Sequence, residues 1–332
     1  MPDMEIGLAL PQYDYSVPGQ DPLNYPVILQ HAQQARMLGV TSLWLSDHIV
    51  LDLVKYGGEP RDYGAFEPLT TLVALSQMVP DVRLGTLVLC EGIRSIPLLA
   101  KTASSADAVM GGRLELGIGA GWYEPDYSMV GLEMPPVGER MARLKESLQA
   151  LRTLFGPGPV DFKGRFTNFT GAYTLPASPQ IGGPPLWVGG KGDRLLGIVA
   201  AGADGWNTCW VWTHEAYDAR RAVLDAHCDR INRDPASIRR SVGLYALVGE
   251  NESDLASRFE RLKQNTPRGV MSGVSLEDWR QGRLVGTVEE VRDQLGRWGE
   301  LGIESVIVGL GAVPFQVGSL DDLDPIMAAA ST

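Results

Sequence analysis

Short apolar runs alternate with amphipathic stretches along most of the chain. The apolar runs, such as "SLWLSDH" (42–48) and "VRLGTLVL" (82–89), predict buried strands. The stretches between them repeat apolar residues about every three or four positions, as in "GERMARLKESLQALRTLF" (138–155), and this spacing predicts helices. Strands that alternate with helices are typical of a parallel sheet covered by helices.

The pattern predicts eight strands, near residues 6, 43, 83, 114, 186, 205, 242 and 305. The helices predicted between and after them span 25–39, 68–79, 97–112, 138–155, 193–202, 214–232, about 252–264, 287–302 and 320–330. Gly39 and Pro68 support two of these boundaries, because glycine is favoured at the end of a helix and proline in its first turn. Eight parallel strands with intervening helices predict an α/β fold of the (β/α)8 TIM barrel type.

Two irregular stretches interrupt this rhythm. Residues 156–185 are rich in Gly, Pro and aromatic residues and predict an insertion with a small hairpin, and 265–283 is a second insertion. A two-domain Rossmann enzyme is the competing architecture. Because no Pro/Gly/Ser-rich linker divides the chain into two halves, we expect a single domain over 1–332.

Composition narrows the class of protein. Apolar residues make up 44% of the chain, enough for a sizeable core. Acidic residues outnumber basic ones by 40 to 29, giving a formal charge of −11 without any Lys/Arg block. This balance argues against nucleic acid or a membrane surface as a partner, and solubility alone explains it.

The cysteines and the first ten residues indicate whether disulfides, a metal site or a secretion signal are to be expected. Cys90, Cys209 and Cys228 are far apart and form no CxxC motif, and the chain has only four histidines. We therefore expect no disulfide framework and no metal site. "MPDMEIGLAL" (1–10) has no basic leader pattern, and no long apolar span follows, so we expect a cytoplasmic protein.

The strand that ends in "RLELGIGAGWYE" (113–124) carries three glycines. The dinucleotide fingerprint G-x-G-x-x-G fails here, because its third glycine would fall on Trp122. Glycines at the end of a barrel strand can let a planar ring approach the backbone, or they can relieve crowding at a tight corner. The spacing leaves both interpretations open.

Two further stretches place polar groups at strand ends. In "VGGKGDRLLG" (188–197) glycines precede a helix start, where backbone N–H groups and Lys191 suit a phosphate. An ordinary glycine-rich turn is the alternative, and barrel phosphate sites more often follow strands 7 and 8. In "LSDHIV" (45–50) Asp47 and His48 can position a ring and move a proton. A helix cap or another structural role is the alternative for this pair.

These stretches together resemble the luciferase-like flavin and deazaflavin oxidoreductase superfamily. The resemblance is strong over about residues 5–210 and rests on "LWLSDH" (43–48), "LGTLVL" (84–89), "GGRLELGIGAGW" (111–122), "ERMARLKESLQALRTLF" (139–155) and "PLWVGGKGDRLLGIVAAGADGWN" (185–207). The chain looks most like the branch that uses coenzyme F420, an 8-hydroxy-5-deazaflavin. The resemblance implies a barrel with the cofactor ring across its C-terminal mouth.

The resemblance also assigns roles to residues. It implies that Asp47 contacts the ring system and that His48 faces the reacting edge. It implies a cis peptide between Leu87 and Val88 whose bulge supports the ring. The remaining cofactor residues that it implies are Cys90, Ala120, Gly121, Gly189, Gly190 and Lys191.

One departure from the family pattern concerns the substrate. Some sugar-phosphate dehydrogenases of this branch carry a catalytic Glu where this chain has Trp122, and Glu124 lies two residues later. We therefore expect an apolar or aromatic substrate pocket. Its candidate walls are Tyr13, Trp122, Trp210 and Trp212. Ordinary core packing of these aromatic residues is the alternative.

The leading functional hypothesis is hydride transfer between C5 of F420 and a small organic substrate, with His48 supplying the proton. An FMN-dependent monooxygenase that uses reduced flavin and oxygen is the first alternative. A non-enzymatic flavin-binding barrel is the second. The resemblance also suggests a homodimer.

Overall fold

Eight parallel strands close into a barrel in the computed structural model, which describes residues 4–331. The strands follow one another around the ring in chain order, and pairing of β7 with β10 and of β14 with β1 closes it. They are β1 (Glu5–Ala9), β2 (Ser42–Leu45), β5 (Arg83–Thr86), β7 (Leu114–Gly119), β10 (Leu186–Gly189), β11 (Gly205–Trp210), β12 (Arg239–Gly249) and β14 (Ser305–Gly309). All eight predicted strands are thus confirmed, and the closed ring excludes the Rossmann alternative.

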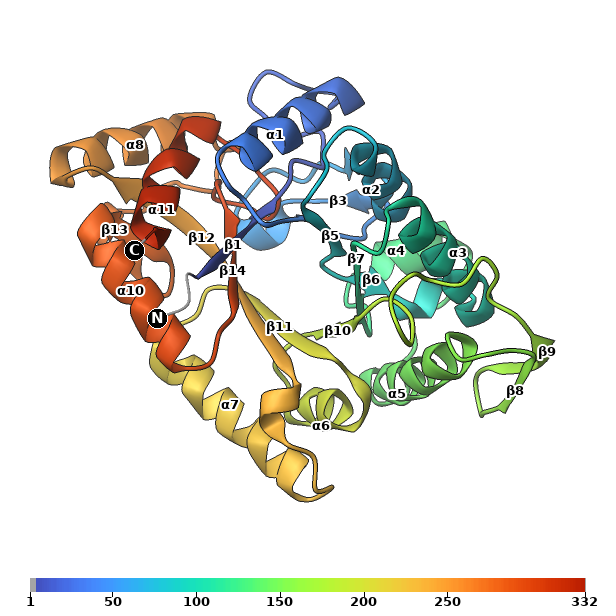
Figure 1. Cartoon of the computed structure of the whole chain (residues 1–332). Helices are drawn as coiled ribbons and strands as arrows, with labels where there is room; N and C mark the ends of the chain where they lie inside the picture. Colours follow the sequence, from blue (N-terminus) through green and yellow to red (C-terminus); the bar gives the residue numbers. More distant parts are fainter. Residues whose placement is uncertain (1–3, 332) are drawn as a thin grey trace.

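Helices surround the strands (Figure 1). They are α1 (Tyr25–Met37), α2 (Pro68–Ser76), α3 (Ile96–Val109), α5 (Val137–Leu154), α6 (Asp193–Gly202), α7 (His214–Asp229), α8 (Glu252–Asn265), α10 (Val288–Glu300) and α11 (Leu323–Ala330). Each matches a predicted helix, and no end differs from its predicted position by more than three residues. None of the helices within residues 4–331 combines the length and the apolar character needed to cross a bilayer.

Local chemistry explains the helix ends. The Asn24 side chain accepts the backbone N–H of Val27 at 3.3 Å and so caps the start of α1. Gly39 follows the end of that helix with a φ of +96°, a conformation that glycine adopts without steric cost. At α10, Thr287 and Glu290 form a reciprocal capping box.

Two tryptophans fill the middle of the barrel. Trp44 of β2 and Trp187 of β10 meet edge to face with ring centroids 6.2 Å apart. Gly85 and Gly205 leave room for them, since an added Cβ would lie 2.2 Å from Trp44 and 2.3 Å from Trp187. The Trp187 indole N–H also donates to the buried Glu115 carboxylate at 2.5 Å. The interior is therefore a packed core, and the strand ends carry the site.

The two insertions contain short elements. Residues 156–185 include the predicted hairpin, formed by β8 (Val160–Lys163) and β9 (Asn168–Ala172). Residues 265–283 contain α9 (Leu276–Arg280) and lead into β13 (Leu284–Thr287), which pairs in parallel with the end of β12. The pattern did not predict α9 or β13, because each has at most five residues and neither shows a period.

The loop after β2 folds over the face of the barrel where the C-terminal ends of the strands lie. It contains a small antiparallel pair, β3 (Val50–Leu51) and β4 (Tyr63–Gly64), with one 3-10 turn (Val54–Tyr56) between them. Another short element, β6 (Leu89–Cys90), pairs with β7 directly after the 87–88 bulge. These segments bring side chains from distant parts of the sequence to the C-terminal ends of the strands.

Candidate active site

His48 follows β2, and a buried carboxylate holds its imidazole. His48 Nδ1 lies 2.7 Å from Asp126 Oδ2, and Asp126 Oδ1 accepts the backbone N–H of Ile49 at 2.9 Å. Asp126 comes from α4 (Glu124–Met129), a short helix after β7. Because a carboxylate only accepts hydrogen bonds, Nδ1 carries the hydrogen and Nε2 is the basic nitrogen. The pair is suited to exchanging a proton at Nε2.

Aromatic rings surround this histidine. Trp122 and Tyr123 meet the imidazole edge-on, with ring centroids 5.5 Å and 5.4 Å away. Trp122 is 48% exposed, and Lys55 Nζ lies 4.1 Å from its ring centroid. The structure therefore brings predicted residues His48 and Trp122 together, with a cation covering the outer face of the indole.

Asp47 lies beside His48 in the chain, but its carboxylate has other partners. The Arg94 guanidinium donates to both Asp47 oxygens, and the bond from Nη2 to Oδ1 measures 2.6 Å. The backbone N–H of Cys90 also donates to Asp47, at 2.6 Å. Asp47 therefore links the end of β2 to the bulge before Cys90. A paired, buried carboxylate of this kind fixes geometry and is already neutralised by its partner.

The glycines of β7 and β10 surround the side chain of Val88. The peptide between Leu87 and Val88 is cis, as the family resemblance implied. An added Cβ would come within 2.9 Å of Val88 at Gly117, 2.7 Å at Gly119 and 3.0 Å at Gly189. These glycines make room for Val88, and at Gly117 an added Cβ would also lie 2.0 Å from the Thr86 carbonyl oxygen. Val88 itself stays partly exposed and presents an apolar surface at the mouth of the barrel.

Gly121 continues this surface next to Cys90. Gly121 has a φ of +71°, and an added Cβ would lie 2.5 Å from the Cys90 sulfur. The Tyr127 hydroxyl donates to the carbonyl of Ala120 at 3.2 Å and fixes the same turn. Burial raises the pKa of the Cys90 thiol, so this group stays neutral at physiological pH. Buried Cys90 and Ala120 thus form one corner with the partly exposed Gly121.

The start of α6 combines free backbone donors with a cation. Gly190 has a φ of +136° and directs the chain from β10 into the turn. Gly192 occupies the N-cap position, where no side chain caps the helix and an added Cβ would meet nothing within 4 Å. Lys191 is exposed in the same turn. This arrangement fits a phosphate, because the first N–H groups of a helix favour an anion.

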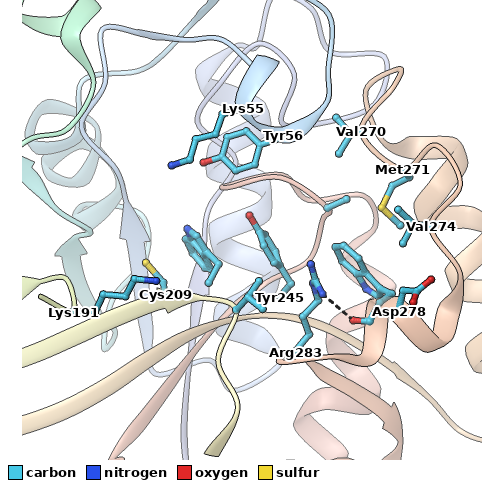
Figure 2. Close-up of a pocket in the computed structure, with 14 residues that line it drawn as sticks. Lys55, Tyr56, Lys191, Cys209, Tyr245, Val270, Met271, Val274, Asp278 and Arg283 are labelled. Carbon is cyan, nitrogen blue, oxygen red and sulfur yellow. Dashed lines mark hydrogen bonds between the residues drawn. The ribbon is translucent and has the colours of Figure 1, made fainter. Parts of the chain in front are cut away.

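A cavity of about 550 Å³ opens beside these residues (Figure 2). Its walls come from the ends of β11, β12 and β14 and from the two loops that contain Lys55 and α9. Trp210 lines it and stacks on Tyr245, with ring centroids 5.4 Å apart. Lys191 also lines it, so the turn before α6 borders the same space.

Two predicted pocket residues are buried and do not line the cavity. Tyr13 is completely buried, and its hydroxyl forms a close hydrogen bond with the Ser46 hydroxyl behind His48. Trp212 is also buried, and its ring centroid lies 5.5 Å from Lys191 Nζ. Core packing, the alternative for these aromatic residues, describes both positions. Trp210 borders the cavity, and Trp122 borders His48.

Several residues of this region could not be predicted from the sequence. Asp126 lies on a helix of six residues, too short to show a period, although a carboxylate soon after a strand end was a usable signal. Arg94 follows the third barrel strand, and only the fold places it against Asp47. Arg283 and Trp279 belong to the irregular insertion, where no spacing predicts which side chains face inward.

Comparisons with known proteins agree with this fold. The model of the family described as luciferase-like monooxygenase matches residues 4–305. An F420-dependent glucose-6-phosphate dehydrogenase from Amycolatopsis mediterranei is 28% identical over 183 residues, 54% of this chain. The match spans about half, 51%, of that relative's length. An F420-dependent hydroxymycolic acid dehydrogenase from Mycobacterium tuberculosis is 26% identical over 312 residues, 91% of this chain and 81% of the relative.

A solved structure shares the fold. An F420-dependent secondary alcohol dehydrogenase, solved with an F420-acetone adduct, superposes with a TM-score of 0.77 over 99% of this chain and 100% of its own. Its sequence identity is 18%, so the likeness concerns the fold. The family match covers nearly the whole described chain, and the closed barrel agrees with it. The chain belongs to the luciferase-like monooxygenase family of oxidoreductases.

Proposed function

We propose that this chain is an F420-dependent oxidoreductase that transfers a hydride between the cofactor and a small organic substrate. The observation that carries the proposal is the His48–Asp126 pair at the mouth of a luciferase-like barrel, beside Trp122 and close to the cavity. The F420-dependent relatives and the likeness to an F420 enzyme support the choice of cofactor.

The residues present fit this group. The uncapped start of α6, with Gly190 and Lys191, would hold the cofactor phosphate. Val88, the apolar side chain between the glycines of β7 and β10, would lie behind the ring. Asp47 and the corner formed by Cys90, Ala120 and Gly121 would border the ring at its other edges. When bound, the deazaflavin supplies or accepts a hydride at C5.

The protein supplies the proton and the surroundings. Asp126 fixes the His48 ring, which leaves Nε2 free to give a proton to the substrate or to take one from it. Trp122 and Tyr123 shield the imidazole from bulk water on the sides they cover. A fixed, partly shielded base of this kind spares the reaction the entropy of positioning a proton donor.

A cofactor titration tests the proposal. Purified protein is titrated with F420 and, separately, with FMN while tryptophan fluorescence is followed. We expect saturable quenching with F420 and much weaker binding of FMN. Tight FMN binding without any response to F420 would contradict the choice of cofactor.

An FMN-dependent monooxygenase is the second candidate. It is supported by a relative described as pyrimidine monooxygenase RutA, from Enterobacter cloacae, which is 32% identical over 200 residues but aligned over only 52% of its length. A deazaflavin lacks the N5 atom of a flavin and reacts poorly with oxygen, so the two candidates differ in oxygen use. Substrate-dependent oxygen consumption with reduced FMN would favour this candidate.

A further inference from the structure

The cavity wall carries more positive than negative charge, although the chain as a whole is acidic. Lys55, Lys191 and Arg283 line the cavity, and Asp278 is the one carboxylate among its described lining residues. Asp278 is engaged with Ser275, whose hydroxyl lies 2.5 Å from its carboxylate. Among residues 4–331, no carboxylate oxygen lies within 4.0 Å of a nitrogen of any of the three cations. The cavity therefore carries a net positive charge, and among the described residues no carboxylate contacts its three cations.

Arg283 is the most constrained of these cations. Its Nη1 donates to the carbonyls of Trp279 at 3.3 Å and Gln281 at 3.0 Å, and its Nε is buried without a partner. Among the described residues, Nη2 donates to no protein atom. Figure 2 shows the guanidinium beside Tyr245, reaching into the cavity. Nη2 is therefore the donor that remains for a ligand, and a charged N–H of this kind suits a carboxylate or phosphate.

The pKa shifts of the lining residues also favour the binding of an anion in this cavity. Burial lowers the pKa of Arg283, which means that the charged form is poorly solvated where it sits. Burial also raises the pKa of Tyr56 to about 12 and that of Tyr245 well above its ordinary value. Both phenols therefore keep their hydrogens at neutral pH. An anion in the cavity would supply the missing counter-charge.

Aromatic surface occupies the rest of the wall. Tyr245 stacks on Trp210 and packs against Trp279, with ring centroids 5.9 Å apart in the second pair. Lys55 connects this wall to the predicted catalytic residue, because it lines the cavity and also covers Trp122, which contacts His48. Lys55 therefore lies between the cavity wall and the indole that contacts His48.

We propose that this cavity binds an organic anion, with its carboxylate or phosphate on Arg283 and its aromatic or apolar body against Trp210 and Tyr245, and that this anion is the substrate. The inference rests on the proposed function, because it names the substrate class of the same site. The same anionic chemistry is present in the phosphate and glutamate tail of F420. The test must therefore separate substrate from cofactor tail.

The first measurement uses probes and no cofactor. Benzoate, phenyl phosphate and the neutral benzamide are titrated into the wild-type protein by calorimetry. We expect the anions to bind about tenfold or more tightly than benzamide, the ratio typical of one charge-assisted contact. Equal binding of benzoate and benzamide would overturn the proposal without any variant.

The second measurement uses variants. Arg283→Gln is expected to remove the preference for anions and to leave benzamide binding unchanged, whereas Arg283→Lys keeps part of the preference. Arg268→Gln is the matched control, because Arg268 is 91% exposed, belongs to the same insertion and is not among the lining residues. An unchanged anion preference in a folded Arg283→Gln protein would contradict the assignment of Arg283. If Arg283→Gln does not fold, the anion preference of Arg283→Lys is compared with that of the wild type. A partial loss supports the assignment of Arg283, and an unchanged preference contradicts it.

The third measurement separates the two sources of the anion. F420 and 8-hydroxy-5-deazariboflavin, which has the ring but neither phosphate nor glutamates, are titrated into the wild type and Arg283→Gln. We expect unchanged affinity for both. If Arg283→Gln loses affinity for F420 but not for 8-hydroxy-5-deazariboflavin, Arg283 binds the cofactor tail, and the substrate proposal is overturned. Failure of F420 to bind the wild type would instead refute the proposed function and leave the probe result intact.

Discussion

The chemistry proposed for this protein depends on the His48 imidazole, whose orientation is fixed by a hydrogen bond to Asp126. His48 alone could rotate about its side-chain bonds, but the 2.7 Å bond from Nδ1 to Asp126 selects one orientation and one hydrogen position. Asp126 is only 2% exposed and also accepts the N–H of Ile49, so the carboxylate is itself held. The proton-transfer role therefore belongs to a pair of residues.

Replacing His48 tests the role of the imidazole. In His48→Ala the proposed proton-transfer group is lost while the residues proposed to hold the cofactor are unchanged. We expect turnover to fall by a factor on the order of 10² to 10⁴, the range for a lost general acid or base, with little change in F420 affinity. Steady-state kinetics and fluorescence titration measure the two quantities. Wild-type turnover with a confirmed substrate would rule out the assignment.

Replacing Asp126 tests the positioning role. In Asp126→Asn the hydrogen-bonding geometry can persist, but the charge that stabilises a protonated imidazole is lost. We expect a lower kcat than in the wild type, a smaller loss than in His48→Ala, and a changed pH profile of kcat. Asp126→Glu should restore part of the rate. A purely structural role for Asp126 would lower thermal stability and leave the pH profile unchanged.

At the scale of single elements, glycines decide how the barrel packs. Gly85 of β5 faces Trp44, and an added Cβ would lie 2.2 Å from the indole. We expect Gly85→Ala to lower the free energy of unfolding by about 1–3 kcal/mol, the usual cost of overpacking a core. Gly296 of α10 is the matched control, since an added Cβ there meets nothing within 4 Å. Gly296→Ala should stabilise the protein by about 0.5–1 kcal/mol, and urea unfolding measures both. Equal effects would contradict this account of the barrel interior.

The same elements show how far the sequence alone reaches. The eight barrel strands could be predicted because they are buried on both faces and so read as short apolar runs. The nine helices could be predicted because each buries one face, which imposes a period on its sequence. The elements that were missed, such as α4 and α9, are too short to show one. The glycines at 117, 119 and 189 could be recognised as special. Their partner, Val88, could not be derived from spacing, because only barrel closure brings β7 and β10 beside the bulge.

At the scale of the whole molecule, the rest of the site could not be predicted because its residues come from loops that are distant in the sequence. Asp47, His48, Lys191 and Trp210 could be named because each stands at a strand end. Their partners come from distant loops, as Arg94 does for Asp47 and Lys55 does for Trp122. Such contacts depend on loop conformation, which side-chain patterns along one strand or helix do not encode. The acidic composition likewise gave no sign of a cationic cavity.

Acid sensitivity is a further property of the whole molecule, since two histidines on different helices contribute to it. Burial lowers the pKa of His31 in α1 and of His214 in α7 below the ordinary histidine value of about 6.5. As the pH falls below 6.5 the unfolded chain takes up protons that the folded protein resists, so stability that is present at higher pH is lost. Each histidine can contribute a slope of at most about 1.4 kcal/mol per pH unit.

The double variant His31→Gln/His214→Gln should therefore lose less stability than the wild type between about pH 7.5 and pH 5.5, the range that brackets the unfolded histidine pKa. Both side chains donate to backbone carbonyls, His31 to Val27 at 2.8 Å and His214 to Gln294 at 3.2 Å. A glutamine can replace part of that bonding but carries no titratable group. Urea unfolding at several pH values gives the slope, and the values near pH 7.5 correct for any constant effect of the substitutions. Parallel stability curves for the two proteins would show that other groups govern the acid response.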